Sequence, residues 1–221
     1  MVNIEPSNTV CIVGCGNVGS MLIGKLPPLH QTFRPIAVNL DWSGSFQASA
    51  PRNHPYIDFG DSKAPRGLFN PTDEYLFAHT RNTVDEQIDC VLDAIGQANT
   101  VLLMGMAAGS TAAGIILGLA QNLLIRGVPT AVALAMPAFF EGKHRERRAE
   151  AIHERLSFGG RSTTRIEFAR GEVQGMGLAE AFRYMDHKII VATCAVARRI
   201  AGGGKAGDFP GGYTDRLGGG R

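Results

Sequence analysis

A loop of small residues between two apolar runs constrains the fold of this chain more than any other feature. Residues 105–114 read Gly-Met-Ala-Ala-Gly-Ser-Thr-Ala-Ala-Gly; the apolar run 100–104 precedes them and the apolar run 115–120 follows. This order is typical of a buried strand, a tight loop and a helix. Small side chains let backbone N–H groups approach an anion, and a helix N-terminus adds unpaired donors. The segment therefore predicts a phosphate-binding loop.

A second loop of the same kind lies near the N-terminus. Residues 14–20 read Gly-Cys-Gly-Asn-Val-Gly-Ser and separate a strand-like run, 10–13, from a helix-like run, 21–26. Two such loops in one sheet can hold the phosphates of a nucleotide from two sides.

Strands and helices alternate along the chain. The patterns predict strands at 9–13, 35–40, 100–104, 129–136 and 163–168, and helices at 18–26, 83–97, 110–126, 141–156 and 178–201. Thr83 and Glu86 fit a capping box, and the Gly-, Pro-, Ser- and Asn-rich residues 43–72 predict a long loop. The alternation predicts an α/β fold with a doubly wound parallel sheet, closed by a long C-terminal helix. Ligands of such sheets bind at the carboxyl ends of the strands.

Composition excludes several functional classes. The chain has 221 residues, 44% of them hydrophobic, and a net charge of +2, which gives no strong electrostatic case for nucleic acid. No apolar run is long enough to predict a membrane span, and the N-terminus lacks the plan of a signal peptide. The cysteines and histidines show no metal-ligand spacing, and we expect Cys11 and Cys194 to be small core residues. These features favour a cytoplasmic protein.

Several segments, in order along the chain, resemble the GTP-binding domain of the tubulin/FtsZ family of cytoskeletal proteins. They are Gly14-Cys15-Gly16-Asn17-Val18-Gly19 for the first phosphate loop, Ile36 to Asp41 for the second strand and its end, Asn70-Pro71 for the loop over the γ-phosphate, Gly105 to Ala113 for the glycine-rich signature, Pro137 to Arg145 for the segment similar to KPFNFEGKKR, and Ala181-Phe182 with Asp186 for the central helix. The resemblance implies a Rossmann-like nucleotide-binding domain over residues 1–201, followed by a flexible Gly-rich tail, 202–221.

The resemblance also implies a site for GTP or GDP, with Mg²⁺ as an optional companion. It assigns Gly16, Asn17 and Ser20, with Gly14 and Gly19 of the same loop, to the α- and β-phosphates, and Asn39, Asp41 and Asn70 to the γ-phosphate side. It assigns Gly109, Ser110 and Thr111, with Gly105, Ala107 and Ala108 of the same loop, to a wrap around the phosphates.

For the sugar and the base, the resemblance implies roles for side chains of two later segments. Glu141 accepts from the ribose hydroxyls, Arg145 reaches the ribose or a phosphate, and Pro137 belongs to the same segment. Phe182 stacks on the base and Asp186 accepts from the guanine ring N–H and amino group. A carboxylate suits that edge because guanine presents two donors there and adenine does not.

The chain departs from the family pattern at several places. Ala107 and Ala108 replace glycines of the signature, and Phe168 stands where the family has an asparagine. We expect no second domain and no acidic catalytic loop after the central helix, so no catalytic residue is assigned and hydrolysis of GTP is expected to be slow or to need a partner. The predicted helix 178–201 has a second apolar face that contains Ile190, Val191 and Cys194. If this face is exposed, it predicts a homo-oligomer or co-assembly with a related protein.

Two other functions stay open at this point. The first alternative to GTP binding is a non-hydrolysing scaffold or regulatory protein that keeps the fold. The second is an NAD(P)-binding Rossmann protein. In the latter case Gly14-x-Gly16-x-x-Gly19 is the dinucleotide fingerprint and Asp41 holds the ribose. Arg147 and Arg148 are expected on a solvated helix face.

Overall fold

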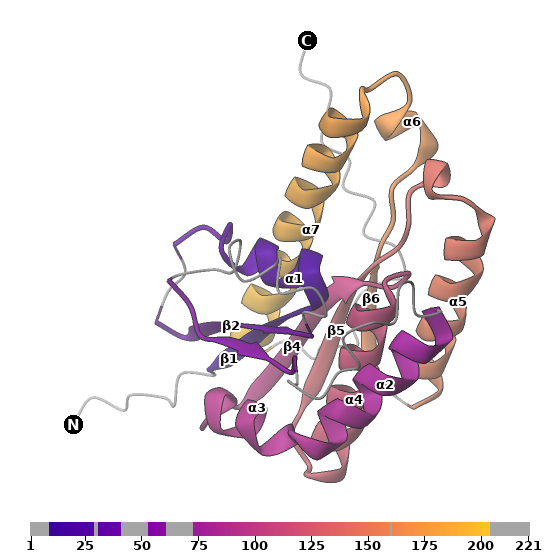
Figure 1. The fold of residues 1–221 in the computed structure, drawn as a ribbon. Helices are drawn as coiled ribbons and strands as arrows, with labels where there is room; N and C mark the ends of the chain where they lie inside the picture. The colour runs from indigo at the N-terminus through magenta and orange to yellow at the C-terminus, as the bar shows by residue number, and fades with distance from the viewer. Residues whose placement is uncertain (1–8, 29–30, 41–52, 61–72, 160, 204–221) are drawn as a thin grey trace.

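A computed structural model describes residues 9–28, 31–40, 53–60, 73–159 and 161–203 (Figure 1). The strands are β1 (Val10–Cys15), β2 (Phe33–Asn39), β3 (Tyr56–Asp58), β4 (Thr100–Met106), β5 (Thr130–Ala135) and β6 (Ser162–Ile166). The helices are α1 (Gly16–Ile23), α2 (Asp73–Glu86), α3 (Ile88–Ile95), α4 (Ser110–Ile125), the 3-10 turn η2 (Phe139–Glu141), α5 (Lys143–Phe158), α6 (Arg170–Val173) and α7 (Leu178–Ala201). Asp41, Asn70 and nearly all of the predicted tail lie outside the described residues.

The described strands form one parallel sheet in the order β3-β2-β1-β4-β5-β6. This confirms the predicted α/β fold with a doubly wound parallel sheet. Chain order reverses between β1 and β4, because the connection after β1 runs outward to β2 and β3 before the chain returns to β4. In open parallel sheets, a ligand crevice forms outside the carboxyl ends of the two strands at such a switch point. The fold thus directs attention to the ends of β1 and β4.

Two hydrophobic layers sandwich the sheet. On one face, alternate β1 residues such as Val13 pack against apolar side chains of α2 to α5. On the other face, the intervening residues, such as Ile12, pack against α1 and α7. Helices α1 and α4 therefore lie on opposite faces, although both begin at the same edge of the sheet. Cys11 and Cys194 are both buried, as predicted.

Three local predictions were wrong. The helix predicted at 83–97 is two helices, α2 and α3, with a break at Gln87, and Thr83 lies inside α2, where its hydroxyl donates to the His79 carbonyl (2.9 Å). Residues 56–58, predicted as loop, form the edge strand β3, a strand too short to show a period. The helix predicted from 141 begins at Lys143, because Gly142 adopts φ +92° and separates η2 from α5.

Candidate functional site

Glycines in β1, α1 and β4 bring α1 close to the sheet. A Cβ on Gly14 would overlap the carbonyl group of Gly19, and a Cβ on Gly19 would lie 2.9 Å from the Met104 carbonyl oxygen. A Cβ on Gly105 would lie 2.9 Å from the Cys15 carbonyl oxygen. These three glycines are therefore required for backbone packing. They help to place the first turn of α1 directly over the switch point.

The first turns of α1 and α4 meet at this point. Gly16 begins α1 with φ +73°, a conformation that L side chains rarely adopt. A Cβ on Gly16 would lie 2.8 Å from the Cβ of Ala112, which is in the first turn of α4. The N-termini of α1 and α4, which lie on opposite faces of the sheet, therefore meet at the switch point between β1 and β4.

Neither N-terminus has a side-chain cap. In α4 the first intrahelical bond runs from the Ala113 N–H to the Gly109 carbonyl (2.8 Å), so the N–H groups of Thr111 and Ala112 have no acceptor within the helix. Uncapped N–H groups and the positive ends of two helix dipoles form an environment that favours an anion.

The loop before α4 offers fewer donors than its sequence predicts. The Ala107 N–H donates to the Ala135 carbonyl (2.8 Å) and the Gly109 N–H to the Met106 carbonyl (3.2 Å). The side chains of Ala107 and Ala108 are buried. Gly109 has ordinary backbone angles, and a Cβ there would lie 3.6 Å from its nearest neighbour. Two N–H groups of this loop are therefore already bonded within the protein.

Arg148 of α5 lies at the start of α4. Its Nη1 donates to the Ser110 Oγ (2.8 Å), and its Nη2 is 3.7 Å from the Glu74 carboxylate. The prediction that Arg148 belongs to a solvated helix face was wrong; Arg147, the adjacent residue, is exposed as predicted. Periodicity along a strongly charged helix could not reveal this, because the contact depends on how α5 packs against α4.

Two asparagines lie beside the α1 N-terminus. The Asn39 Nδ2 donates to the Oδ1 of the exposed Asn17 (2.7 Å), and the Oδ1 of Asn39, which is fully buried, has no partner among the described residues. An orphaned acceptor here fits a ligand that brings a donor. Ser20, by contrast, is buried and its hydroxyl donates to the carbonyls of Val38 (3.2 Å) and Gly14 (3.4 Å), so this side chain supports the sheet.

The segment after β5 places Glu141 and Arg145 at the same edge. The Oε1 of Glu141 accepts from the Ala138 N–H (2.9 Å) and its Oε2 is 3.0 Å from the Arg145 Nε. Pro137 precedes this turn and is half-buried. Both side chains assigned to the ribose thus already interact with each other.

The first turns of α7 carry aromatic and charged side chains at the surface. Phe182 is 45% exposed, and its ring meets the Phe140 ring edge-to-face with centroids 5.8 Å apart. One turn later, the Asp186 Oδ2 is 2.7 Å from the Nζ of Lys25, which follows α1. Sequence analysis missed Lys25, since a lysine after a helix carries no motif. Further along α7, Cys194 is buried, so the predicted self-association face lacks it.

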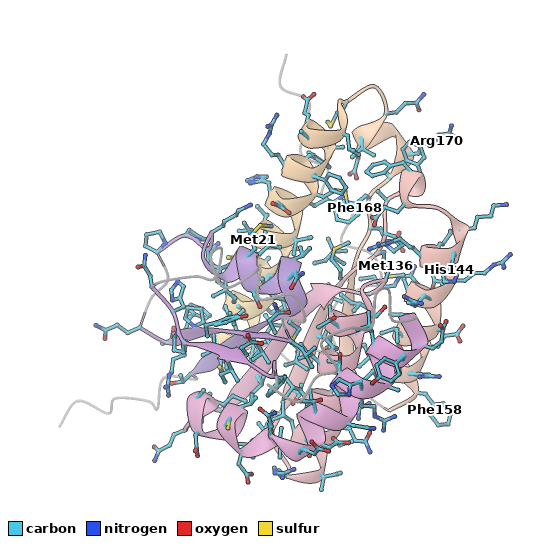
Figure 2. All side chains as sticks on the ribbon, viewed as in Figure 1. Met21, Met136, His144, Phe158, Phe168 and Arg170 are labelled. Carbon is cyan, nitrogen blue, oxygen red and sulfur yellow. The ribbon has the colours of Figure 1, made fainter. Side chains whose placement is uncertain are left out.

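Phe168 and Arg170 lie on the segment that leads from β6 into α6 (Figure 2). Phe168 is buried in the α7 layer, with the Lys188 ammonium 5.9 Å from its ring centroid. The Arg170 guanidinium lies 5.1 Å from the centroid of Phe139. An open hollow of about 380 Å³ lies between Phe139 and Phe140, the segment 173–176 and the start of α7. Phe168 cannot supply a hydrogen bond to a ligand in this region.

The described residues include buried cysteine thiols that are poor nucleophiles and no candidate metal site. Burial raises the pKa of the Cys11 thiol to about 12 and raises that of the Cys15 thiol further, so both stay protonated at neutral pH. The described residues contain no group of three or more His, Cys, Asp or Glu arranged to hold a metal ion. No described helix has both the length and the apolar character needed to cross a bilayer.

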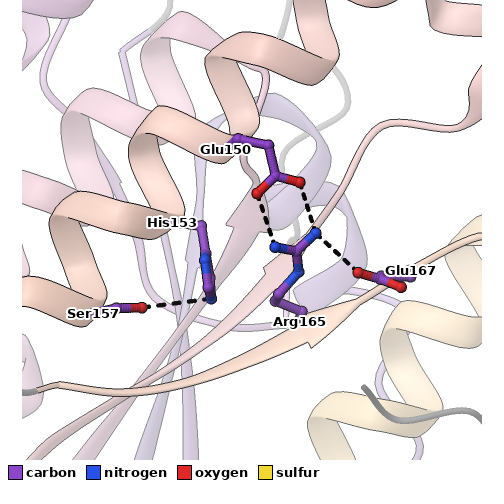
Figure 3. A network of polar contacts seen from close by, with 5 residues as sticks. All are labelled: Glu150, His153, Ser157, Arg165 and Glu167. Atoms are coloured by element: carbon purple, nitrogen blue, oxygen red, sulfur yellow. Dashed lines mark hydrogen bonds and ion pairs between the residues drawn. The ribbon is translucent and has the colours of Figure 1, made fainter. Parts of the chain in front are cut away.

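A second cluster of charges lies away from these helix N-termini, between α5 and the edge strand β6 (Figure 3). The Arg165 guanidinium donates to both carboxylate oxygens of Glu150 (2.8 and 2.7 Å) and contacts Glu167 (2.9 Å). These bonds lower the pKa of Glu150, whereas burial lowers the pKa of the neighbouring His153. The bidentate pairing ties α5 to the sheet edge and engages both carboxylate oxygens of Glu150.

Comparison with solved structures decides the fold type. FtsZ from M. jannaschii, as an empty dimer, matches with a TM-score of 0.71 and 20% identity over 90% of this chain and 57% of its own. CetZ2 from Haloferax volcanii, a GTPγS-bound protofilament, gives 0.65 and 17% over 87% and 57%. TubZ from Bacillus thuringiensis serovar israelensis, a GTPγS-form protofilament, gives 0.59 and 12% over 86% and 55%. The chain has the tubulin/FtsZ-type fold.

This tubulin/FtsZ-type chain spans a little over half the length of the structures it matches. No protein-family model matches the sequence, and no curated protein sequence matches it either. The fold places Gly16, Asn17, Ser110 and Thr111 at one edge with Glu141, Arg145, Phe182 and Asp186. It assigns Gly14, Gly19, Ser20 and Gly105 to packing.

Proposed function

We propose that this chain binds guanine nucleotides, with the phosphates at the joined N-termini of α1 and α4 and the base beside Phe182 and Asp186. The observation that carries the proposal is the contact of Gly16 with Ala112, since it makes two uncapped helix N-termini face one anion. The exposed Phe182 ring supports a ligand that offers an aromatic face.

Turnover of GTP is proposed to be slow or to depend on a partner. Two acidic side chains at this edge are already engaged: Glu141 caps its own turn and pairs with Arg145, and Asp186 pairs with Lys25. Neither is placed to activate a water molecule for attack on the γ-phosphate. Two of the matched structures are GTPγS protofilaments. We therefore propose that this chain self-assembles or co-assembles with a related protein.

A nucleotide-binding titration tests the proposal. Purified protein is titrated with GTP, GDP, ATP and NAD, with and without Mg²⁺, and the unchanged chain is compared with Gly109→Arg. A Cβ at Gly109 meets only ordinary contacts. We therefore expect the Gly109→Arg variant to fold, while its long side chain blocks access of a ligand to the first turn of α4. Leu124→Arg is the matched control, because it places the same side chain on an exposed position at the far end of the same helix.

Guanine-selective binding that Gly109→Arg abolishes and Leu124→Arg retains is the expected result. Binding of NAD in preference to GTP would move the chain to the dinucleotide class. Failure of all four nucleotides to bind would favour a scaffold, a function consistent with the buried Ala107 and Ala108 in the loop and the buried Phe168. Phosphate release and pelleting assays on the nucleotide-bound protein then measure turnover and assembly.

A further inference from the structure

The ion pair between Lys25 and Asp186 joins two helices at the edge of the proposed base site. Lys25 follows α1, Asp186 lies in the third turn of α7, and both helices pack on the same face of the sheet. The Lys25 side chain is 48% exposed and the Asp186 side chain 21% exposed, so a ligand can reach both. The pair costs little to share with a ligand, because exposed ion pairs contribute little stability.

The pair has spare hydrogen-bonding capacity. Among the described residues, Asp186 uses only Oδ2, and that bond is to Lys25. Lys25 carries three donors and no acceptor, and it uses one donor here. The site therefore presents donors from Lys25 next to acceptors from Asp186. Phe182, four residues before Asp186 on the same face of α7, supplies a flat apolar surface beside them.

This pattern of donors beside acceptors matches one purine. A base stacked on Phe182 with its edge toward Asp186 places the neighbouring edge group at Lys25. In guanine, the ring N–H and the amino group are donors and the adjacent O6 is an acceptor, so both halves of the pair are complemented. In adenine, the ring nitrogen would face the carboxylate and the amino group would face the ammonium. Both contacts would then be mismatched, and a site built to hydrogen-bond one group rejects the analogue that lacks it.

We infer that Lys25 is a specificity-determining residue of this site, donating a hydrogen bond to O6 of guanine while Asp186 accepts from the N1–H and amino groups. The inference rests on the proposed function and adds a cationic partner to it.

The test compares affinities for GDP, IDP and ADP in Lys25→Met and Lys25→Arg. IDP keeps O6 and the ring N–H but lacks the amino group. Lys25→Met should weaken GDP and IDP by a similar factor, about tenfold, while ADP affinity does not fall. Lys25→Arg should restore most of the preference for GDP. Ratios of affinities within one variant are insensitive to the fraction of protein that is folded.

Arg183→Met is the matched control. Arg183 is an exposed cation on α7 next to Phe182, so this variant removes the same charge from the same region. It should change GDP and ADP affinity by the same factor. An equal loss of GDP and ADP binding in Lys25→Met would overturn the inference, as would tighter GDP binding, which would mean that Lys25 competes with the base for Asp186. Absence of guanine nucleotide binding in the unchanged protein would overturn the proposed function itself, together with this inference.

Discussion

The phosphate end and the base end of the proposed site are formed by different parts of the chain, backbone groups at the first and side chains at the second. The phosphate end consists of backbone: glycines that let α1 approach the sheet, and the N–H groups of two helix turns. The base end consists of exposed and half-buried side chains that already pair with one another, Lys25 with Asp186 and Glu141 with Arg145. Packing therefore fixes the first end as part of folding. The second end can change without loss of the fold, and it is where selectivity for a ligand can vary.

Gly14→Ala should break the phosphate end with the largest effect. The new Cβ overlaps the Gly19 carbonyl, and a backbone atom cannot move aside as a flexible side chain can. We expect a loss of about 3 kcal/mol in the free energy of unfolding, measured by urea denaturation. Gly171→Ala is the control, since a Cβ there has nothing within 4 Å, and it should leave stability unchanged or slightly higher. A Gly14 variant as stable as this control would remove the distinction between the two ends.

Arg148→Met sharpens the comparison, because Arg148 is a side chain at the backbone-built end. Its guanidinium bonds to the Ser110 hydroxyl and adds a full positive charge beside the α4 amides. We expect GTP affinity to fall about tenfold, with little change in the preference for GTP over ATP. Equilibrium titration measures both, and the exposed Arg147→Met is the control for charge. A change in base preference would mean that the two ends are coupled.

The same contrast explains how far sequence reasoning reached. The backbone-built end carries a dense local signal, glycine spacing between apolar runs, so the strands β1 and β4, the helices that follow them and the parallel sheet were predictable. The loop predicted at 14–20 was wrong, because β1 runs to Cys15 and α1 begins at Gly16, and the loop predicted at 105–114 is limited to the few residues between Met106 and Ser110. Sequence order alone could not separate glycines that pack, such as Gly14 and Gly105, from Gly16, whose positive φ opens the α1 N-terminus.

For contacts between side chains, the sequence signal was weaker at both ends. The partners of Asp186 and of Ser110 come from distant segments: Lys25 lies 161 positions from Asp186 along the chain, and Arg148 lies 38 positions from Ser110. Such contacts depend on helix packing, so no spacing rule could predict them. The two breaks in predicted helices, at Gln87 and Gly142, were missed for a related reason, because apolar and charged periodicity continues across them.

A change in the charge cluster between α5 and β6 should have the smallest effect on stability, and none on the base end. Glu150 is paired by Arg165, which lowers the carboxyl pKa in the folded protein. A lowered folded pKa stabilises the protein above the ordinary pKa of the carboxyl group, and this stability is lost as pH falls through the folded value. We expect the unfolding free energy to drop between about pH 5 and pH 3, and to drop less in Glu150→Gln, whose amide does not titrate.

At neutral pH the Glu150→Gln variant should be less stable by no more than about 1 kcal/mol, because the pair is partly exposed and screened by solvent. Glu154→Gln, an exposed position one turn along α5, should keep the pH slope of the unchanged protein. Urea denaturation across this pH range measures both variants. Neither change should alter nucleotide affinity, in contrast to Lys25→Met. If Glu150→Gln keeps the full acid sensitivity, Arg165 does not stabilise the Glu150 carboxylate. If it alters nucleotide affinity, paired charges on α5 would belong to the site, and the boundary of the base end would have to move beyond Glu141 and Arg145.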